Sequence, residues 1–375
     1  MKGPLHRQDS NQSRLQVLVV DDSAVARQVL KQILETDPAI QVTTASDPII
    51  AFGKIEKCVP DVIITDLEMP RMDGLTFMRQ LLRTWRIPVV VCSGTAGTGA
   101  SGAMSMLEEG AVEVIARPRV GLRDFLHESA VMLLDAVWSA SCSRPRSKLR
   151  YAPLLPQPRF SADAVLPRSK RPPASERTSK IIAIGSSTGG IEAIRELLRP
   201  LDDGSPGIVI AQHMPQGFTN AFARRLNEEC QIRVKEAVSG DRVQNGCALI
   251  APGNRHMLVH ARGGYYVVEI KDGPLVSRHR PSVDVLFRSV AQAAGANAIG
   301  IILTGMGDDG AQGLLEMKQA GATTFAQDEN SCVVFGMPKE AIKAGAVSSV
   351  LSLGEIRNQL LSMKEPTKTV PGLPS

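Results

Sequence analysis

Residues 15–138 alternate between short apolar runs and amphipathic segments. Apolar runs bounded by polar residues are typical of buried strands, whereas apolar residues spaced three or four apart are typical of helices that cover them. The predicted strands are residues 16–22, 40–46, 61–67, 87–93 and 112–116, and the predicted helices are residues 23–36, 48–57, 75–84, 103–109 and 121–138. Strands that alternate with helices over short connections predict a parallel sheet with helices on both faces.

The same alternation returns at Lys180 and continues to about Met363. The apolar runs that predict strands there are residues 181–185, 207–213, 298–304 and 322–326, with helical stretches between several of them. A strand-rich stretch, residues 247–270, interrupts the alternation and predicts hairpins around Gly263-Gly264. We therefore expect a second doubly wound α/β domain with a hairpin insertion over residues 180–363.

The segment between the two domains, residues 139–179, has repeated prolines and scattered apolar residues without strand or helix spacing. It predicts an extended, flexible linker. Ten basic and only two acidic side chains fall between residues 141 and 180, nearly all of them within the linker, so the net charge of +5 belongs to this segment and the rest of the chain is net negative. This location argues against a nucleic-acid-binding face. Residues 364–375 are expected to form a loose tail.

The composition is that of an ordinary globular protein, with 43% hydrophobic and 22% charged residues. No apolar run approaches the roughly 18 residues of a membrane span. The N-terminal sequence lacks the apolar core of a signal peptide, so we expect a cytoplasmic protein. The six cysteines include no Cys-x-x-Cys pair, which fits reduced thiols and gives no zinc signal.

Three acids follow strands of the first domain at the sheet edge where α/β proteins form their sites. Asp21 and Asp22 end the first predicted strand and Asp66 ends the third, while the hydroxyl of Ser93 ends the fourth. Neighbouring carboxylates repel one another unless a cation lies between them, and an all-oxygen cluster suits Mg²⁺. The alternative is that these acids are helix caps or solvated loop charges.

The motifs VVDDS, TDLEMPRMDG, VVVCSGT and ARP follow in order within residues 15–135. This set resembles the response-regulator receiver domain, which is flavodoxin-like. The resemblance implies that Asp66 accepts a phosphoryl group from a histidine kinase, that Asp21 and Asp22 hold Mg²⁺ with it, and that Ser93 senses the phosphate. Arg117 stands where the family has lysine, and it offers a planar fork in place of a compact ammonium.

In the second domain, the sequence GSSTG at residues 185–189 matches G-x-S-x-G with Ser187 at its centre. Such an elbow between a strand and a helix exposes the central hydroxyl, whereas Ser186 points back into the turn. A serine nucleophile needs a base and an orienting acid. His213 ends the next strand, and Asp308 and Asp309 follow another, so all can reach one rim; His256 is a competing histidine that could line the cleft. The alternative is a glycine-rich turn with a capping serine.

Two stretches, residues 97–102 and 305–310, match the dinucleotide-binding pattern G-x-G-x-x-G, and Asp328 lies at the spacing of a ribose-binding acid. The first follows the fourth strand, where such a site is not expected. The second places two carboxylates where the pyrophosphate would bind, and they would repel it. Dinucleotide binding is therefore a remote alternative.

The motifs IGSSTGG, QHMP, APGNRHM, HRPSVDVLF, LTGMGDDG and QDENSCVVFGMPKEA lie within residues 180–363. Together they resemble the chemotaxis protein-glutamate methylesterase family, with a Rossmann-like catalytic domain. The resemblance implies the triad Ser187, His213 and Asp309 and an oxyanion donor at the Met306 N–H. The elbow geometry adds the Thr188 N–H to the expected oxyanion hole.

The resemblance also implies the reaction, which is the hydrolysis of glutamate γ-methyl esters, and the deamidation of particular glutamines, on methyl-accepting chemotaxis receptors. The esterase reaction needs no cofactor, and the unphosphorylated receiver covers the catalytic cleft. We expect a monomer without nucleic-acid partners or membrane insertion. A different class stays open, namely a phosphorylation-dependent receptor-binding regulator whose esterase is idle.

Overall fold

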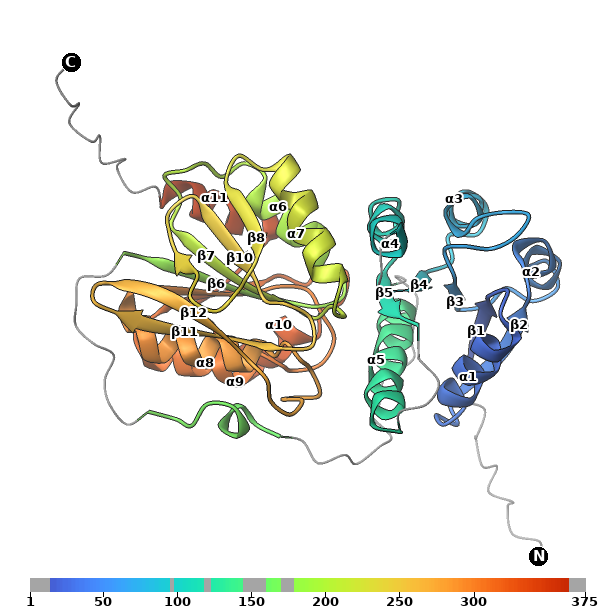
Figure 1. Ribbon diagram of the computed structural model, residues 1–375, viewed down its shortest axis with the longest axis horizontal. Coiled ribbons are helices and arrows are strands. Elements are labelled where there is room, and N and C mark those ends of the chain that lie inside the picture. Colours follow the sequence, from blue (N-terminus) through green and yellow to red (C-terminus); the bar gives the residue numbers. More distant parts are fainter. Residues whose placement is uncertain (1–13, 95–97, 118–122, 144–159, 170–178, 364–375) are drawn as a thin grey trace, which may run out of the picture.

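The computed structural model describes residues 14–94, 98–117, 123–143, 160–169 and 179–363 (Figure 1). The N-terminal residues 1–13, the linker residues 144–159 and 170–178, and the predicted tail lie outside this description. Among the helices that the structure describes, none combines the length and apolarity needed to cross a membrane.

The described part of the first domain is a five-stranded parallel sheet in the order β2-β1-β3-β4-β5. Helices α1 and α5 cover one face, and α2, α3 and α4 cover the other. Its strands are β1 (Leu15–Val20), β2 (Ile40–Ala45), β3 (Val62–Thr65), β4 (Val89–Ser93) and β5 (Glu113–Ala116), and its helices are α1 (Ala24–Leu34), α2 (Pro48–Ile55), α3 (Gly74–Thr84), α4 (Thr98–Glu108) and α5 (Arg123–Cys142). The doubly wound fold predicted from the alternation is confirmed here.

Short polar side chains cap the N-termini of three of these helices. The side chains of Ser23, Asp47 and Asp73 accept hydrogen bonds from the first amides of α1, α2 and α3. Helix α5 runs four residues into the predicted linker before it ends at Cys142.

The catalytic domain, residues 179–363, contains a larger parallel sheet. Within the described residues it has seven strands in the order β15-β14-β13-β6-β7-β10-β8, and a smaller antiparallel sheet has the order β11-β12-β9. The strands are β6 (Ile181–Ser186), β7 (Gly207–Gln212), β8 (Arg233–Glu236), β9 (Arg242–Val243), β10 (Cys247–Ile250), β11 (His256–Arg262), β12 (Tyr265–Lys271), β13 (Ala298–Ile302), β14 (Thr323–Gln327) and β15 (Ser349–Leu351).

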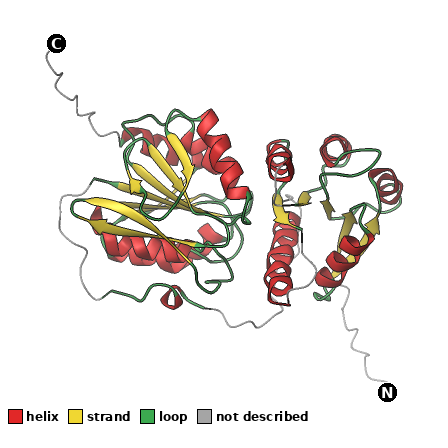
Figure 2. Cartoon of the chain, in the orientation of Figure 1, coloured by secondary structure: helices red, strands yellow, loops and turns green. Residues whose placement is uncertain are grey.

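Helices cover both faces of this larger sheet (Figure 2). Helices α6, α7 and α11 pack on one face, while α8, α9 and α10 pack on the other together with the β11–β12 hairpin. The helices are α6 (Gly190–Leu198), α7 (Phe218–Glu229), α8 (Val283–Ala294), α9 (Ala311–Gln319), α10 (Met337–Lys343) and α11 (Leu353–Ser362), with a short 3₁₀ turn, η2 (Gly295–Asn297), after α8.

One predicted element changes place. We expected residues 247–250 to belong to the hairpin region, but β10 pairs in parallel with β7 and β8 in the main sheet. Its residues Ala248–Ile250 are fully buried, as expected for a strand that has a neighbouring strand on each side and lies in a sheet covered on both faces. The hairpin itself forms at β11 and β12, with Gly263 and Gly264 at positive φ in its turn, as predicted.

The predicted linker is not extended throughout. Residues 160–169, here called the docked segment, lie along α8 and α9 and include a 3₁₀ turn, η1 (Ala162–Ala164) (Figure 1). Ala162 and Val165 are buried against Leu258, Val276 and Val285 of the catalytic domain. This docking could not be predicted from hydrophobic periodicity, because two buried side chains in ten residues make no recognisable period.

Candidate active site

The chain turns sharply at the end of β6 and places Ser187 at the sheet edge. Ser187 is 9% exposed, and its N–H donates to Thr304 O at 3.1 Å. The turn depends on glycine at two points. Gly189 has φ 79° at the start of α6, and a Cβ on Gly305 would lie 2.7 Å from Cβ of Ser187.

The two adjacent serines have different surroundings. Ser186 is fully buried, and its hydroxyl donates to Gln212 Oε1 at 2.6 Å. The amide of Gln212 in turn donates to Ser187 O at 2.9 Å. Gln212 therefore holds the elbow in place through hydrogen bonds to both serines, and Ser187 is the one of the two that lines the cavity described below.

His213 follows β7, the neighbour of β6, and Ser186 pairs in register with Gln212. Ser187 and His213 are therefore the first residues beyond two adjacent strand ends. The Nε2 atom of His213 lies 2.8 Å from Oδ2 of Asp309. Its Nδ1 atom is buried and has no hydrogen-bond partner. This nitrogen is the one available to take a proton.

Asp309 is a buried carboxylate supplied with hydrogen-bond donors. In addition to His213, it accepts from Ser282 Oγ at 2.8 Å and from the amides of Val283 at 2.7 Å and Asp284 at 3.1 Å. Burial alone would raise the pKa of Asp309, but the hydrogen bond and charge of His213, the charge of His279 and the Val283 amide outweigh it and hold this pKa below its usual value. Asp309 is thus a fixed anion at the first turn of α8.

A cavity of about 710 Å³ connects these residues with the receiver. Ser187, Thr188, His213 and Met306 line it from the catalytic domain. The receiver supplies the opposite wall from β5 and α5, through residues 113–117 and residues 132, 135, 136 and 139. The Met306 side chain also packs against the apolar core of the receiver.

The second histidine at the cavity, beside His213, is not the one that we expected. We expected His256 to line the cleft, but it is fully buried behind it. Its Nε2 lies 2.9 Å from Pro274 O, and its Nδ1 accepts from the Ser282 amide at 3.3 Å, so both nitrogens are occupied. His279, which the sequence analysis did not select, lines the cavity and stacks on His213. Its only signal was its place at the head of HRPSVDVLF.

Glu113 links the two domains at the active site. Its Oε2 accepts a hydrogen bond of 2.6 Å from Thr188 Oγ1, one residue beyond Ser187. Burial between the domains raises the pKa of Glu113 to about 7, although the Thr188 hydroxyl opposes this shift. Nearby, α4 packs against α7, and Arg225 forms an ion pair with Glu108.

The three receiver acids meet as predicted from the strand ends. Oxygens of Asp21, Asp22 and Asp66 lie within 4.8 Å of one another. Arg117 bridges two of them, with one nitrogen 3.0 Å from Asp21 and 2.5 Å from Asp66. Burial raises the pKa of Asp66 to about 6 even though Arg117 lowers it. Burial also raises the pKa of Asp21.

The carboxylate cluster fits a divalent cation. Mg²⁺ holds oxygen ligands at about 2.0–2.1 Å, so opposite ligands are roughly 4 Å apart, and small side-chain rotations would bring these oxygens to that spacing. Ser93 is buried at the end of β4, and its carbonyl accepts the Arg117 N–H at 2.9 Å. Because β4 lies between β5 and the strands of the acids, the Arg117 side chain reaches across the end of β4 to contact Asp21 and Asp66.

Neither stretch with the dinucleotide pattern forms a phosphate loop. Residues 98–102 are the first turns of α4, while residue 97 lies outside the description. In residues 305–310, Gly305 packs against Ser187, and Asp309 is already saturated with donors. Asp328 accepts hydrogen bonds from its neighbour Ser331.

Comparison with known proteins assigns the chain to a family. The model of the CheB methylesterase domain matches residues 182–360, and that of the response regulator receiver domain matches residues 17–126. A protein-glutamate methylesterase/protein-glutamine glutaminase of Anaeromyxobacter dehalogenans is 55% identical over 93% of this chain and 96% of its own length. The chain belongs to the CheB methylesterase family. The family and the enzyme class predicted from the sequence are thereby confirmed.

The chain is also similar to a second relative and to a solved structure. A protein-glutamate methylesterase/protein-glutamine glutaminase of Rhodospirillum rubrum is 54% identical over 93% of this chain and 98% of its own length. The crystal structure of the Thermotoga maritima CheB methylesterase catalytic domain is 38% identical and has a TM-score of 0.48, and the match covers 50% of this chain and 99% of that one.

Proposed function

We propose that this protein hydrolyses γ-methyl esters of glutamate, and deamidates particular glutamines, on methyl-accepting chemotaxis receptors through Ser187, His213 and Asp309. The names of the relatives supply the reaction. The observation that carries the residue assignment is that His213 is held by Asp309 at Nε2 while its buried Nδ1 has no hydrogen-bond partner, and that His213 and Ser187 line the same cavity.

The proposed chemistry is acyl transfer. His213 Nδ1 accepts the Ser187 proton while Oγ attacks the ester carbonyl carbon. The protonated imidazole then gives that proton to the departing methoxide, so methanol leaves and an acyl-serine remains. Water attacks this ester with His213 again as base, which releases glutamate. For a glutamine the same steps release ammonia.

The surrounding groups divide the electrostatic work. Asp309 stabilises the imidazolium and requires that the hydrogen of the neutral ring is on Nε2. Thr188 and Met306 line the cavity, and their N–H groups are the proposed donors to the oxyanion, which develops its charge in the transition state. All of these groups belong to the chain itself, and the proposed esterase steps use no cofactor.

The receiver is proposed to inhibit this site by occupying its access. The receiver lines the cavity with residues of β5 and α5, and Ser187 and His213 line it from the other domain, so the receiver lies where a receptor helix, about 10–12 Å wide with its side chains, would have to enter. Activation therefore requires a shift in the population of domain arrangements.

Phosphorylation of Asp66 by a histidine kinase is the proposed trigger. Asp21, Asp22 and Asp66 would hold Mg²⁺, which neutralises charge on the incoming phosphoryl group when it is bound. Arg117 and Glu113 flank the same strand, β5, about 13 Å apart at 3.3 Å per residue. A phosphoryl group that attracts Arg117 acts on the strand whose first residue bonds Thr188.

The test is methanol release from a methylated receptor, with and without a small phosphodonor and Mg²⁺. Ser187→Ala should abolish release, whereas Ser186→Ala should stay active, because its hydroxyl bonds only Gln212 in the elbow. Activity of Ser187→Ala would reject the assignment. Tight receptor binding by wild-type protein without any release would instead favour a binding regulator.

A further inference from the structure

A second imidazole lies flat on the ring of His213. The centroids of the His213 and His279 rings are 3.7 Å apart, and their planes differ by 10°. A ring stacked at this distance blocks rotation of its neighbour, because a turned ring would overlap it. The stack therefore restricts the torsion that aims His213 Nδ1, the nitrogen without a hydrogen-bond partner.

The stack adds a constraint that the triad lacks. The hydrogen bond to Asp309 anchors one atom of the His213 ring, and a ring held at one atom can still pivot about that bond. Contact across the ring face removes this freedom. A nucleophile and base out of line by about 1 Å can lose a hundredfold in rate, so this freedom matters for catalysis.

His279 is presented by a turn that is unfavourable for its sequence. The Val276 and His279 N–H groups donate to each other's carbonyls at 3.1 and 2.9 Å. The two residues between them, Ser277 and Arg278, have φ of 49° and 71°. Positive φ at both central positions is normally supplied by glycine or asparagine. Other residues adopt it where surrounding contacts enforce it, which is common at functional sites.

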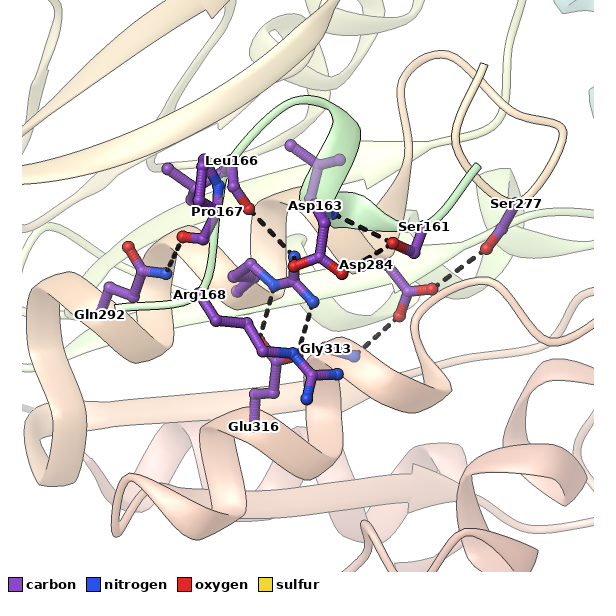
Figure 3. A network of polar contacts seen from close by, with 12 residues as sticks. Ser161, Asp163, Leu166, Pro167, Arg168, Ser277, Asp284, Gln292, Gly313 and Glu316 are labelled. Atoms are coloured by element: carbon purple, nitrogen blue, oxygen red, sulfur yellow. Dashed lines mark hydrogen bonds and ion pairs between the residues drawn. The ribbon is translucent and has the colours of Figure 1, made fainter. Parts of the chain in front are cut away.

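Those surrounding contacts include the linker. The Ser277 N–H donates to Phe160 O of the docked segment at 3.0 Å. The Ser277 hydroxyl donates to Asp284 Oδ2 on α8 at 3.2 Å (Figure 3). The strained turn is thus clamped between α8 and the docked segment.

The docked segment is itself firmly attached. Arg288, 2% exposed, forms an ion pair of 2.9 Å with Asp163 and donates to Leu166 O at 3.0 Å. On its other side, Arg288 binds Glu316 of α9 through two nitrogens, at 2.8 and 2.7 Å (Figure 3). A buried arginine whose partners come from both the catalytic domain and the linker ties the two together.

We propose that His279 is a positioning residue that fixes the ring of His213, and that the docked segment holds the turn that presents it. The proposal rests on the proposed function, since it requires His213 to be the base. It gives residues 160–169 a role beyond joining two domains, because they support the active site directly.

The decisive comparison is between His279→Phe and His279→Leu in the full chain. Both remove the imidazole and have similar bulk, but only phenylalanine presents a flat ring. With phosphodonor and Mg²⁺ present, His279→Leu should lower kcat on the order of ten- to a hundredfold with KM little changed, and His279→Phe should recover most of that loss. Equal kcat for the two variants, or a change in KM alone, would overturn the positioning role.

The linker part is tested by exchanging residues 160–168 for a Gly/Ser sequence of equal length. The exchange should lower kcat in the wild-type chain and have little further effect in His279→Leu, because both act on the same ring. An equal loss in the two backgrounds would overturn it. Unfolding temperatures of all variants are measured in parallel, and only variants that remain folded at the assay temperature are compared.

Ser187→Ala separates failure of this proposal from failure of the proposed function. Methanol release by Ser187→Ala would overturn both. An inactive Ser187→Ala together with equal rates for His279→Phe and His279→Leu would overturn the positioning role alone.

Discussion

Asp66 of the receiver and Asp309 of the catalytic domain are nearly buried carboxylates at the same kind of sheet edge, yet their ionisation differs. They are 6% and 1% exposed. Burial raises the pKa of Asp66 to about 6, with Arg117 as its opposing cation. Asp309 is at least as buried, but the hydrogen bond and charge of His213, the charge of His279 and the Val283 amide keep its pKa low.

The difference shows that neighbouring charges and donors, and not burial alone, decide the ionisation of a buried carboxylate. Asp66 lies beside two further acids, and the charge of Asp21 adds to burial in raising its pKa, which suits a group that takes up a cation and a phosphoryl group. Asp309 has its acceptor sites filled, which suits a permanent anion that orients an imidazole. One architecture therefore supports two chemistries through the groups that follow its strands.

The largest expected effect comes from removing the charge of the catalytic carboxylate. Asp309→Asn should lower kcat for methanol release on the order of 10³–10⁴-fold, because the imidazolium loses its counter-ion and the ring its tautomer. Asp308→Asn is the matched control, since Asp308 lines a different cavity, and should keep a near-normal rate. A wild-type rate in Asp309→Asn would contradict the contrast with Asp66.

Removal of Mg²⁺ should affect the proposed phosphorylation of Asp66 and leave the function of Asp309 unchanged. A chelator should eliminate activation by a phosphodonor and leave the basal rate unchanged, since metal-binding acids occur in the receiver and not among the esterase groups described. Asp66→Asn should give the same result with Mg²⁺ present. A fall of the basal rate on chelation would show that the separation between the sites is wrong.

A smaller effect distinguishes two serine caps. Ser23 caps α1 in the receiver, and Ser282 caps α8 while also donating to Asp309. Ser23→Ala should lower the free energy of unfolding by about 1 kcal/mol, and Ser282→Ala should lower it by more, because it removes both a cap and a hydrogen bond to a charged group. Only Ser282→Ala should also lower kcat, by about tenfold, because a hydrogen bond to a charged group contributes about 1.5–3 kcal/mol. Chemical denaturation and methanol release measure the two effects, and equal kcat losses would refute the special role of Ser282.

The smallest effect concerns pH and domain closure. The pKa of Glu113 is about 7 between the domains, above its ordinary value of 4.5. Because the pKa is raised in the closed arrangement, protonation favours closure; this contribution is full below about pH 4.5 and is lost as the pH rises through about 7. The ratio of unphosphorylated to activated rate should rise severalfold between about pH 6 and pH 8.

Glu113→Gln is the control for this pH effect. Its neutral amide keeps a polar partner for Thr188 and does not titrate, so the ratio should become flat with pH. A pH dependence that persists in Glu113→Gln would assign the effect to another group.

The sequence alone determined most of the secondary structure and the polar residues at the carboxyl ends of the strands in the two parallel sheets. Hydrophobic periodicity is a local property, so the long apolar strands and amphipathic helices could be predicted without knowing their partners. Polar residues that end parallel strands must share one edge, which was enough to group the receiver acids. The strands missed, β8, β9 and β15, are short edge strands with polar residues, where hydrophobic patterning is weak.

Tertiary structure decided the remaining details, because they depend on residues distant in sequence. Whether β10 joins a hairpin or the main sheet depends on β7 and β8. The position of His279 against His213 depends on a turn with positive φ angles that the docked segment holds. The hydrogen bond between Glu113 and Thr188 joins residues 75 positions apart across two domains. Local pattern fixes which face of an element is apolar, but only packing fixes which side chains meet.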